Sequence, residues 1–286
     1  HMKILILGVT GMLGNAIFRY LSSTHDYEVF GTIRTNTGRR FFLDKFQSYL
    51  LANVDVHDQN SLVSVFENVR PEIVINCVGL IKQLAEANDP LLALPINAML
   101  PHRLDRLCSL VGSRLIHIST DCVFSGKKGL YIENDTPDAN DLYGKSKLIG
   151  EVCESPNTLT LRSSFIGHEL NSNKGLIEWF LSQSGTVNGY NKAIFSGIST
   201  VELARIIEQY VLTKPELHGL YHVSAESINK MYLLQLVAKE YGKNIEIIPD
   251  NKVSIDRSLN SSRFRKITGY TPPSWPDLIN MMHKSK

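Results

Sequence analysis

Near its start the chain has an apolar run that leads directly into a glycine-rich turn. KILILG at residues 3–8 and GVTGMLG at residues 8–14 are followed by helical spacing of apolar residues over 12–23. Glycines between a buried strand and a helix allow a tight turn and close approach of the backbone to a pyrophosphate, which the helix N-terminus also favours. The pattern predicts a dinucleotide site whose contacts are Gly8, Thr10, Gly11, Met12, Leu13 and Gly14.

Strand and helix patterns alternate over the first 165 residues. Continuously apolar strands separated by helices are typical of a parallel sheet that is covered on both faces, so the chain is expected to form a Rossmann-type, doubly wound α/β fold. Asn60 or Ser61 is expected to cap the second helix, and Pro101 to kink or break the third. The expected strands are 3–8, 27–33, 72–79, 114–119 and 158–164, and the expected helices are 12–23, 61–69, 96–111 and 141–154.

The pattern changes after about residue 166. A polar loop and a short amphipathic helix share residues 168–185, and a further helix at 199–212 has Ser199 or Thr200 as its cap. A helix at 229–242 and a strand at 244–250 complete an α+β region. We therefore expect a dinucleotide-binding domain over 2–166, rejoined by about 190–215, and a mainly substrate-binding domain over 167–286.

Charge and hydropathy narrow the possible partners. The net charge is +2, and the 30 basic residues are spread along the chain without a long basic block, so nucleic acid and membrane surfaces are not expected partners. No apolar run approaches the roughly 20 residues that span a bilayer. The first residues enter a strand pattern without the features of a signal peptide, which indicates a cytoplasmic protein.

The four cysteines, Cys77, Cys108, Cys122 and Cys153, form no C-x-x-C pair. No His/Cys cluster has the spacing of metal ligands, so no metal site is expected. We expect these residues to be buried, reduced thiols.

The end of the second strand bears on the choice of cofactor. An acid there would accept a hydrogen bond from the ribose 2′-hydroxyl and favour NAD, but the chain reads GTIRT and offers Arg34, with Arg39 and Arg40 close behind. An arginine can pair with a 2′-phosphate, so NADP(H) is favoured over NAD(H). The alternative is that Arg34 is a solvated loop residue. Further cofactor contacts are expected from Asp55 and Val56 near the adenine and from Cys77, Val78 and Gly79 after the next strand.

Tyr143 and Lys147 lie four residues apart in DLYGKSK, so they share one face of a helix. The same spacing recurs at Tyr210 and Lys214, and the spacing alone therefore decides nothing. Upstream of the first pair, the strand in HISTDCVFSG delivers Ser119, Thr120 and Asp121 at its carboxyl end, where ligands bind in such folds. No such strand end precedes Tyr210. We interpret Tyr143 and Lys147 as catalytic and the second pair as structural.

Together these motifs resemble the extended short-chain dehydrogenase/reductase family, and within it the dTDP-4-dehydrorhamnose reductase-like branch. The resemblance covers nearly the whole chain, and it rests on motifs in the family's order and spacing. These motifs are GVTGMLG, STDCVFSG, DLYGKSK, LRSSFIG and, near the C-terminus, SLNSSRF.

The resemblance implies reduction of the C4 ketone of a nucleotide-linked 4-keto-6-deoxy sugar by NADPH. Tyr143 would protonate the nascent alkoxide, Lys147 would bind the nicotinamide ribose and lower the pKa of the tyrosine, and Thr120 would hold the carbonyl oxygen. Bringing a tyrosine pKa from about 10 to neutrality takes about 4 kcal/mol, which a nearby ammonium and the positive charge of the oxidised nicotinamide can supply in a cleft shielded from water. Asn97 resembles the family's active-site asparagine, and Ser119, Asn97, Tyr143 and Lys147 are expected to contact the cofactor.

One position departs from the branch. Its motif reads S-T-D-Y-V-F, and here Cys122 replaces a tyrosine that helps shape the sugar pocket, which allows a substrate other than the rhamnose precursor. Cys122 is either a packing residue or a proton-transfer residue for epimerisation. The dehydratases of the larger family have an acid or a lysine there, which argues against sugar dehydration. The residues expected to contact the substrate are Lys82, Asp121, Cys122, Trp179, Arg257 and Arg263.

The sequence therefore predicts a reductase of a nucleotide sugar that serves deoxysugar and surface polysaccharide biosynthesis. A nucleotide-sugar epimerase or epimerase-reductase on the same scaffold is one alternative. A non-catalytic regulatory subunit that binds NADP(H) is another, although such subunits usually lose the tyrosine or the lysine. A homodimer is possible, and the sequence identifies neither the sugar nor its dTDP or UDP carrier.

Overall fold

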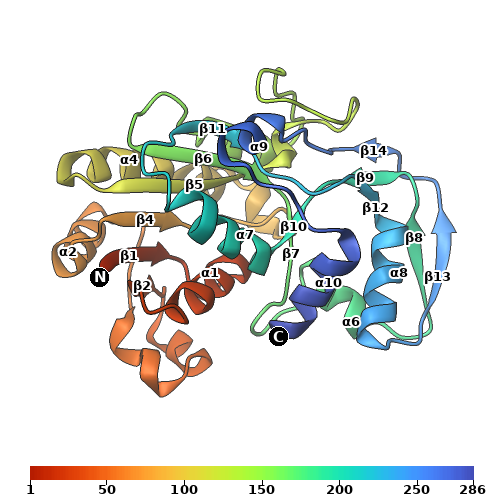
Figure 1. The fold of residues 1–286 in the computed structure, drawn as a ribbon, viewed down its shortest axis with the longest axis horizontal. Helices are drawn as coiled ribbons and strands as arrows, with labels where there is room; N and C mark the ends of the chain where they lie inside the picture. The colour runs from red at the N-terminus through yellow and green to blue at the C-terminus, as the bar shows by residue number, and fades with distance from the viewer.

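A seven-stranded parallel sheet forms the centre of the computed structural model, which describes residues 1–286 (Figure 1). Its strand order is β11-β6-β5-β4-β1-β2-β3, and every neighbouring pair is parallel. The order reverses between β1 and β4, which is the point where doubly wound sheets open a crevice at their carboxyl ends. The strands are β1 (Met2–Leu7), β2 (Tyr27–Thr32), β3 (Leu50–Leu51), β4 (Ile73–Asn76), β5 (Arg114–Thr120), β6 (Thr158–Ser163) and β11 (Gly219–His222).

Helices cover both faces of this sheet, because its inner strands are apolar on both sides. In β1, Ile4 and Ile6 pack into a core with α1 (Met12–Ser22) and α7 (Thr200–Ile206), which lie together on one face. The alternate residues Leu5 and Leu7 pack into a second core with α2 (Gln59–Val69) and α4 (Leu100–Val111). The expected doubly wound α/β fold is confirmed.

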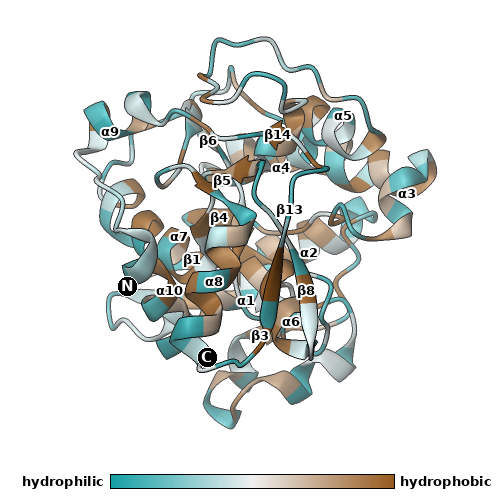
Figure 2. Cartoon of the chain, turned by 90° about the vertical axis from the view of Figure 1, so that its right-hand side faces the viewer, coloured by the Kyte–Doolittle hydropathy of each residue, from teal (hydrophilic) through white to brown (hydrophobic).

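Most of the remaining elements gather beside the carboxyl ends of the central strands, whereas α9 packs against β11 at the edge of the sheet and α5 packs against β5 (Figures 1 and 2). They include a three-stranded sheet in the order β12-β9-β14 and two strand pairs, β13 with β8 and β10 with β7. The strands are β7 (Phe165–Ile166), β8 (Thr186–Tyr190), β9 (Ala193–Phe195), β10 (Ile198–Ser199), β12 (Ile228–Asn229), β13 (Glu246–Asp250) and β14 (Ile255–Asp256). The helices are α3 (Pro90–Ala93), α5 (Leu142–Ile149), α6 (Leu176–Ser182), α8 (Lys230–Tyr241), α9 (Ser262–Thr268) and α10 (Trp275–Lys284).

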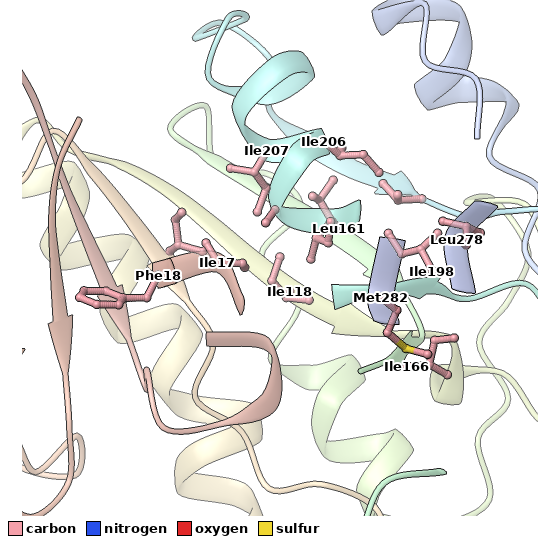
Figure 3. Close-up of a cluster of buried hydrophobic side chains, with 14 of the residues drawn as sticks. Ile17, Phe18, Ile118, Leu161, Ile166, Ile198, Ile206, Ile207, Leu278 and Met282 are labelled. Carbon is pink, nitrogen blue, oxygen red and sulfur yellow. The ribbon is translucent and has the colours of Figure 1, made fainter. Parts of the chain in front are cut away.

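One apolar core joins the sheet to the C-terminal helix. Figure 3 shows Ile17 of α1, Ile118 of β5 and Leu161 of β6 in the same cluster as Leu278 and Met282 of α10. These five side chains are almost fully buried, with at most 6% of the residue surface exposed. The last helix therefore packs into the core of the sheet instead of forming a core of its own.

The structure corrects three details of the expected elements. Asp58, and not Asn60 or Ser61, caps α2 by accepting a hydrogen bond from the Asn60 amide. Pro101 lies in the first turn of α4 and directly follows a π-helical segment at Leu94–Met99, so a change of helix type stands where a kink or an early break was expected. Helix α5 ends at Ile149 and not at residue 154, because the chain turns at Gly150 to bury Glu151.

The later part of the chain contributes more to the central sheet than its pattern indicated. Helix α7 lies within residues 190–215, the segment that was expected to rejoin the dinucleotide-binding domain, and it packs against α1. Strand β11, which follows this segment, also joins the central sheet next to β6. The pattern did not predict this strand, which has only four residues. A division into domains near residue 166 stays a prediction. No helix has the length and apolar character needed to cross a membrane.

Replacing Leu161 by alanine tests how strongly the fold depends on the shared core. Leu161 has no exposed surface, so Leu161→Ala should lower the free energy of unfolding by about 2–5 kcal/mol through lost burial and a residual cavity. Denaturant unfolding measures this change. Leu110→Ala is the matched control, because Leu110 is 83% exposed and should change stability by less than about 0.5 kcal/mol. Equal losses in both variants would contradict the description of the core.

Candidate active site

A cleft of about 450 Å³ opens at the carboxyl ends of β1, β4, β5 and β6. It lies at the point where the strand order reverses, as expected for a ligand site in this fold. Its walls also include residues of β9, β14 and the first turn of α8. The residues expected from sequence that line it are Gly11, Met12, Leu13, Cys77, Val78, Gly79, Lys82, Ser119, Thr120, Asp121, Cys122, Tyr143, Lys147 and Arg257.

The glycine turn after β1 fits a pyrophosphate. Gly8 has a φ of +83°, which is strained for residues with a side chain, and a Cβ at Gly14 would lie only 2.1 Å from the Gly8 carbonyl oxygen. Gly11 is the N-cap of α1 and offers no side chain to the first amides of the helix. The cleft therefore meets a helix N-terminus whose backbone donors are free for an anion.

The three arginines after β2 differ in their freedom to bind a phosphate. Arg39 is held by Asn36 Oδ1 and by the carbonyl oxygens of Gln47 and Leu50. Arg40 donates to the Thr37 carbonyl oxygen. Arg34 is exposed and makes no hydrogen bond or ion pair, so its guanidinium is the free one. A Cβ at Gly38 would lie 3.1 Å from Thr10 Cγ2, so this loop runs next to the glycine turn.

Helix α5 is fixed tightly against the end of β5. The Asp141 side chain caps it by accepting from the Gly144 amide over 2.9 Å, and a Cβ at Gly144 would lie 2.3 Å from the Cys122 carbonyl oxygen. Lys147 is 7% exposed and donates from Nζ to the Ile118 carbonyl oxygen over 3.1 Å. This packing brings Tyr143 and Lys147 to the same cleft wall as Thr120.

The pKa values of the pair depend on burial. Burial raises the pKa of Tyr143, an increase that Cys122 reinforces and the Thr120 hydroxyl opposes. We expected Lys147 to lower this pKa, but in the protein chain itself desolvation of the phenolate outweighs other effects. Burial also lowers the pKa of Lys147 to about 8, with the Glu151 carboxylate opposing the change. At neutral pH the site therefore holds a neutral tyrosine and a protonated lysine.

Asn97 lies behind the cleft and connects two of its walls. Its Oδ1 accepts from the Leu80 amide over 3.0 Å, and its Nδ2 donates to Ser146 Oγ over 3.2 Å. It belongs to the π-helical segment and is 1% exposed. Asn97 thus holds the loop after β4 against α5, and its own side chain does not line the cleft.

A buried ion pair supports the end of β5, and the sequence reasoning missed it. Arg162 of β6 binds Glu151 through two hydrogen bonds of 2.8 and 2.7 Å, and Ser119 Oγ donates to the same carboxylate over 2.6 Å. Arg162 also contacts His222 of β11, whose Nδ1 lies 3.0 Å from the Tyr131 carbonyl oxygen. The available signal was an arginine within a buried strand pattern, since such a charge needs a partner.

Several titratable side chains lie close to Thr120 and Tyr143. Lys82 Nζ lies 3.4 Å from Asp141 Oδ2. Asp121 is 4% exposed, and burial raises its pKa to about 6. Cys122 Sγ donates to Asp121 Oδ1 over 3.4 Å, and burial raises the pKa of this thiol to about 11. Cys122 therefore keeps its proton at neutral pH and acts as a hydrogen-bond donor to Asp121.

A family model described as the RmlD substrate binding domain matches residues 2–283. The chain belongs to the RmlD family. Methionine adenosyltransferase 2 subunit beta of Bos taurus is 29% identical over 157 residues, which are 55% of this chain and 44% of that protein. The chain thus spans less than half of the length of that relative. The dTDP-4-dehydrorhamnose reductase of Aggregatibacter actinomycetemcomitans is 23% identical over 297 residues, with 96% and 95% of the two chains covered.

Solved structures similar to this RmlD family chain share its whole fold. The dTDP-4-dehydrorhamnose reductase of Bacillus anthracis, in complex with NADP, has a TM-score of 0.80 at 22% identity and covers 99% of both chains. A hypothetical dTDP-4-dehydrorhamnose reductase of Sulfolobus tokodaii has a TM-score of 0.77 at 28% identity, with 96% and 98% covered. Other neighbours are described as nucleotide-sugar dehydratases and epimerases in complex with NAD. The extended short-chain dehydrogenase/reductase fold is confirmed.

Several expected contacts of this RmlD family chain lie outside the cleft lining. Trp179 is 37% exposed on α6, and Arg263 donates to the Leu220 carbonyl oxygen and to Asn134 Oδ1.

Tyr210 packs edge-on against Tyr270, which supports its structural interpretation. All four cysteines are free, but only Cys108 is fully buried. The other expected residues outside the lining are Gly8, Thr10, Gly14, Arg34, Asp55, Val56 and Asn97. Gln83, which follows the same strand as Lys82 and was expected to face the sugar with it, does line the cleft, and the polar lining residues that were not predicted are Ser163, Ser164 and Lys230.

The buried Lys147 should destabilise the protein when no cofactor is added. Its native pKa of about 8 lies below the ordinary 10.5, so below pH 8 the burial cost is fully present, and it fades as the pH rises to 10.5. Lys147→Met should therefore raise the free energy of unfolding at pH 7 by about 1–3 kcal/mol, with the gain lost near pH 10.5. Denaturant unfolding at both pH values measures it.

Lys145→Met is the matched control, since Lys145 is exposed on the same helix and should change stability little at either pH. A Lys147→Met variant that is less stable than the wild type at pH 7 would contradict the assigned burial cost.

Proposed function

We propose that this chain is an NADPH-dependent reductase of the C4 ketone of a nucleotide-linked 4-keto-6-deoxy sugar. The observation that carries the proposal is the common cleft wall of Thr120, Tyr143 and Lys147, beside a glycine turn that fits a pyrophosphate. Membership of the RmlD family and the relatives described as dTDP-4-dehydrorhamnose reductases support the substrate class.

The three residues have complementary roles in this proposal. The reduced nicotinamide supplies a hydride when it is bound. Tyr143 keeps its proton at neutral pH and gives it to the sugar oxygen that becomes a hydroxyl. Thr120 Oγ1 accepts from the Cys122 amide over 3.0 Å, and its hydroxyl also acts on Tyr143, so we assign it to the same substrate carbonyl oxygen as the tyrosine. Lys147, held by the Ile118 carbonyl oxygen, places a positive charge next to the oxygen that receives the proton.

Tyr143→Phe tests the proposal directly. With freshly prepared 4-keto-6-deoxy sugars on dTDP and UDP carriers, wild type should oxidise NADPH with one carrier, and the variant should be slower by about 10²-fold or more because the proton donor is gone. Absorbance at the NADPH band measures the rate. The matched control is Tyr210→Phe, the tyrosine of the second Tyr–Lys pair, which should keep wild-type activity.

NADPH that binds without being oxidised by either sugar would contradict the reductase proposal. If Tyr143→Phe keeps full activity, the reductase proposal stands, and only the assignment of Tyr143 as the proton donor is contradicted.

We also propose that Arg34 makes the chain prefer NADP(H) over NAD(H). The support is its free guanidinium, in the loop whose Gly38 runs next to the glycine turn, and the NADP complex of the Bacillus anthracis neighbour. Arg34→Ala should weaken NADPH binding about tenfold or more and leave NADH binding nearly unchanged, because only NADPH has the 2′-phosphate. Fluorescence titration of both cofactors measures this. Arg19→Ala, which removes an exposed arginine from α1, is the control, and equal losses for NADPH and NADH would refute the assignment.

A regulatory subunit that binds NADP(H) is the second candidate. It is favoured by the similarity to methionine adenosyltransferase 2 subunit beta, which covers 55% of this chain. The complete set of Thr120, Tyr143 and Lys147 weighs against it. An epimerase is less supported, because its one candidate for a further proton-transfer residue, Cys122, is a thiol with a pKa raised to about 11. NADPH binding without turnover, together with unchanged cofactor affinity in Tyr143→Phe, would favour the regulatory candidate.

A further inference from the structure

Glu151 is buried at the candidate site, although it does not line the cleft. Helix α5 ends at Ile149, and the chain turns at Gly150, where a Cβ would overlap the Asn97 carbonyl oxygen. Only glycine fits this close approach to the π-helical segment. The turn directs Glu151 back to the end of β5, where its side chain is only 2% exposed.

The carboxylate of Glu151 accepts three hydrogen bonds, and one of them comes from the strand that carries the site. Arg162 donates two, and Ser119 Oγ donates the third over 2.6 Å. Such an ion pair is a weak source of stability, because apolar replacements of a buried pair are often neutral or stabilising. Ser119 offers another explanation for its position, since it directly follows Ile118, whose carbonyl oxygen accepts from Lys147 Nζ.

The two cations near the carboxylate lie on opposite sides of Ser119. Arg162 is paired with Ser119 across β6 and extends towards β11, where its Nη1 lies 3.2 Å from His222 Nε2. Lys147 lies towards the other neighbouring strand, because a Cβ at Gly79, just after β4, would be 3.6 Å from Nζ. The guanidinium thus extends away from the ammonium, and it leaves the carboxylate free to act on the lysine.

The charge of Lys147 depends on this neighbour. Burial lowers the pKa of Lys147 to about 8, and among the groups that oppose this change Glu151 has the largest effect. Asp121 acts on the tyrosine and on the thiol of the cleft wall instead. The other titratable groups packed around the ammonium are uncharged at neutral pH because they are buried, namely Cys77 after β4, Cys122 after β5, Tyr143 on α5 and His117 of β5.

We infer that Glu151 is a positioning residue for the proposed reduction. It keeps Lys147 charged at neutral pH, and through Ser119 it holds the strand whose carbonyl oxygen receives the ammonium. The inference rests on the proposed function, in which the charged lysine stabilises the oxygen that gains negative charge. It deepens that function by assigning the basic limit of the activity to a residue outside the cleft.

A nuclear magnetic resonance titration of Lys147 tests this inference without turnover. In protein whose lysines carry carbon-13 at Cε, the signal that is absent from Lys147→Met identifies this residue, and its midpoint should lie near pH 8. Glu151→Gln should lower the midpoint by about one pH unit, because a favourable charge is lost. Glu151→Asp keeps the charge and should retain most of the wild-type midpoint. Glu154→Gln, which removes an exposed carboxylate from the same segment, is the matched control and should titrate as wild type does.

Arg162→Met separates the charge of Glu151 from the ion pair as a structural unit. Both Glu151→Gln and Arg162→Met break the pair, so a purely structural role predicts the same result for both. The inference predicts a lower midpoint only in Glu151→Gln, since Arg162→Met keeps the carboxylate. The double variant Glu151→Gln/Arg162→Met contains no unpaired charge and should also lower the midpoint, so the test holds where a single variant does not fold.

The pH profile of NADPH oxidation is the second measurement. Lys147 loses its proton as the pH rises, so the rate should fall on the basic side, and Glu151→Gln should show this fall about one pH unit lower than wild type. A variant that is only structurally damaged would lose the same fraction of its rate at every pH.

The outcomes separate this inference from the reductase proposal. The inference is overturned if Glu151→Gln titrates as wild type does, or if Arg162→Met lowers the midpoint by the same amount. A lower midpoint in a protein that oxidises no NADPH keeps the action of Glu151 on Lys147 and refutes the reductase proposal. Normal turnover of the sugar with an unchanged midpoint keeps the reductase proposal and refutes the role of Glu151.

Discussion

The buried ion pair of Glu151 and Arg162 is the interaction on which the candidate site most depends. Both side chains are at most 3% exposed, and they join the segment after α5 to β6 and, through His222, to β11. The carboxylate also accepts from Ser119, the residue before Thr120 in β5. Loss of either partner would leave an unpaired charge in the interior, which typically costs about 3–5 kcal/mol. The pair therefore fixes three strands and a helix end at the edge of the cleft.

The same burial that holds the site together determines its chemistry. Low exposure keeps the proton on Tyr143, and it lowers the pKa of Lys147 to about 8 without removing its charge at neutral pH. A protonated tyrosine beside a cation is the arrangement that a reductase needs, since the carbonyl oxygen gains negative charge as it is reduced. Stability is given up for this arrangement, because both Lys147 and Lys230 are cations in poorly solvated positions.

Much of the fold and part of the site could be predicted from local patterns. The glycine turn, the strands up to residue 164 and the Tyr143–Lys147 spacing are short-range features, and the structure has each of them at the expected place. Features that depend on a distant partner were not predicted. Strand β11 is too short to show periodicity and exists because β6 offers it a free edge. Arg263 was expected in the pocket, but it bonds to Leu220 and Asn134.

The sequence by itself determined the doubly wound α/β class, the dinucleotide turn and the tyrosine–lysine pair, because each is encoded by residues within a few positions of one another. Only the tertiary structure decided which charges are paired, which are buried and which enter the cleft. Lys230 comes into the cleft with Asp121 although more than a hundred residues separate them in the chain. The charge and pKa of such groups depend on the partners and the solvent around them, and long-range packing alone sets both.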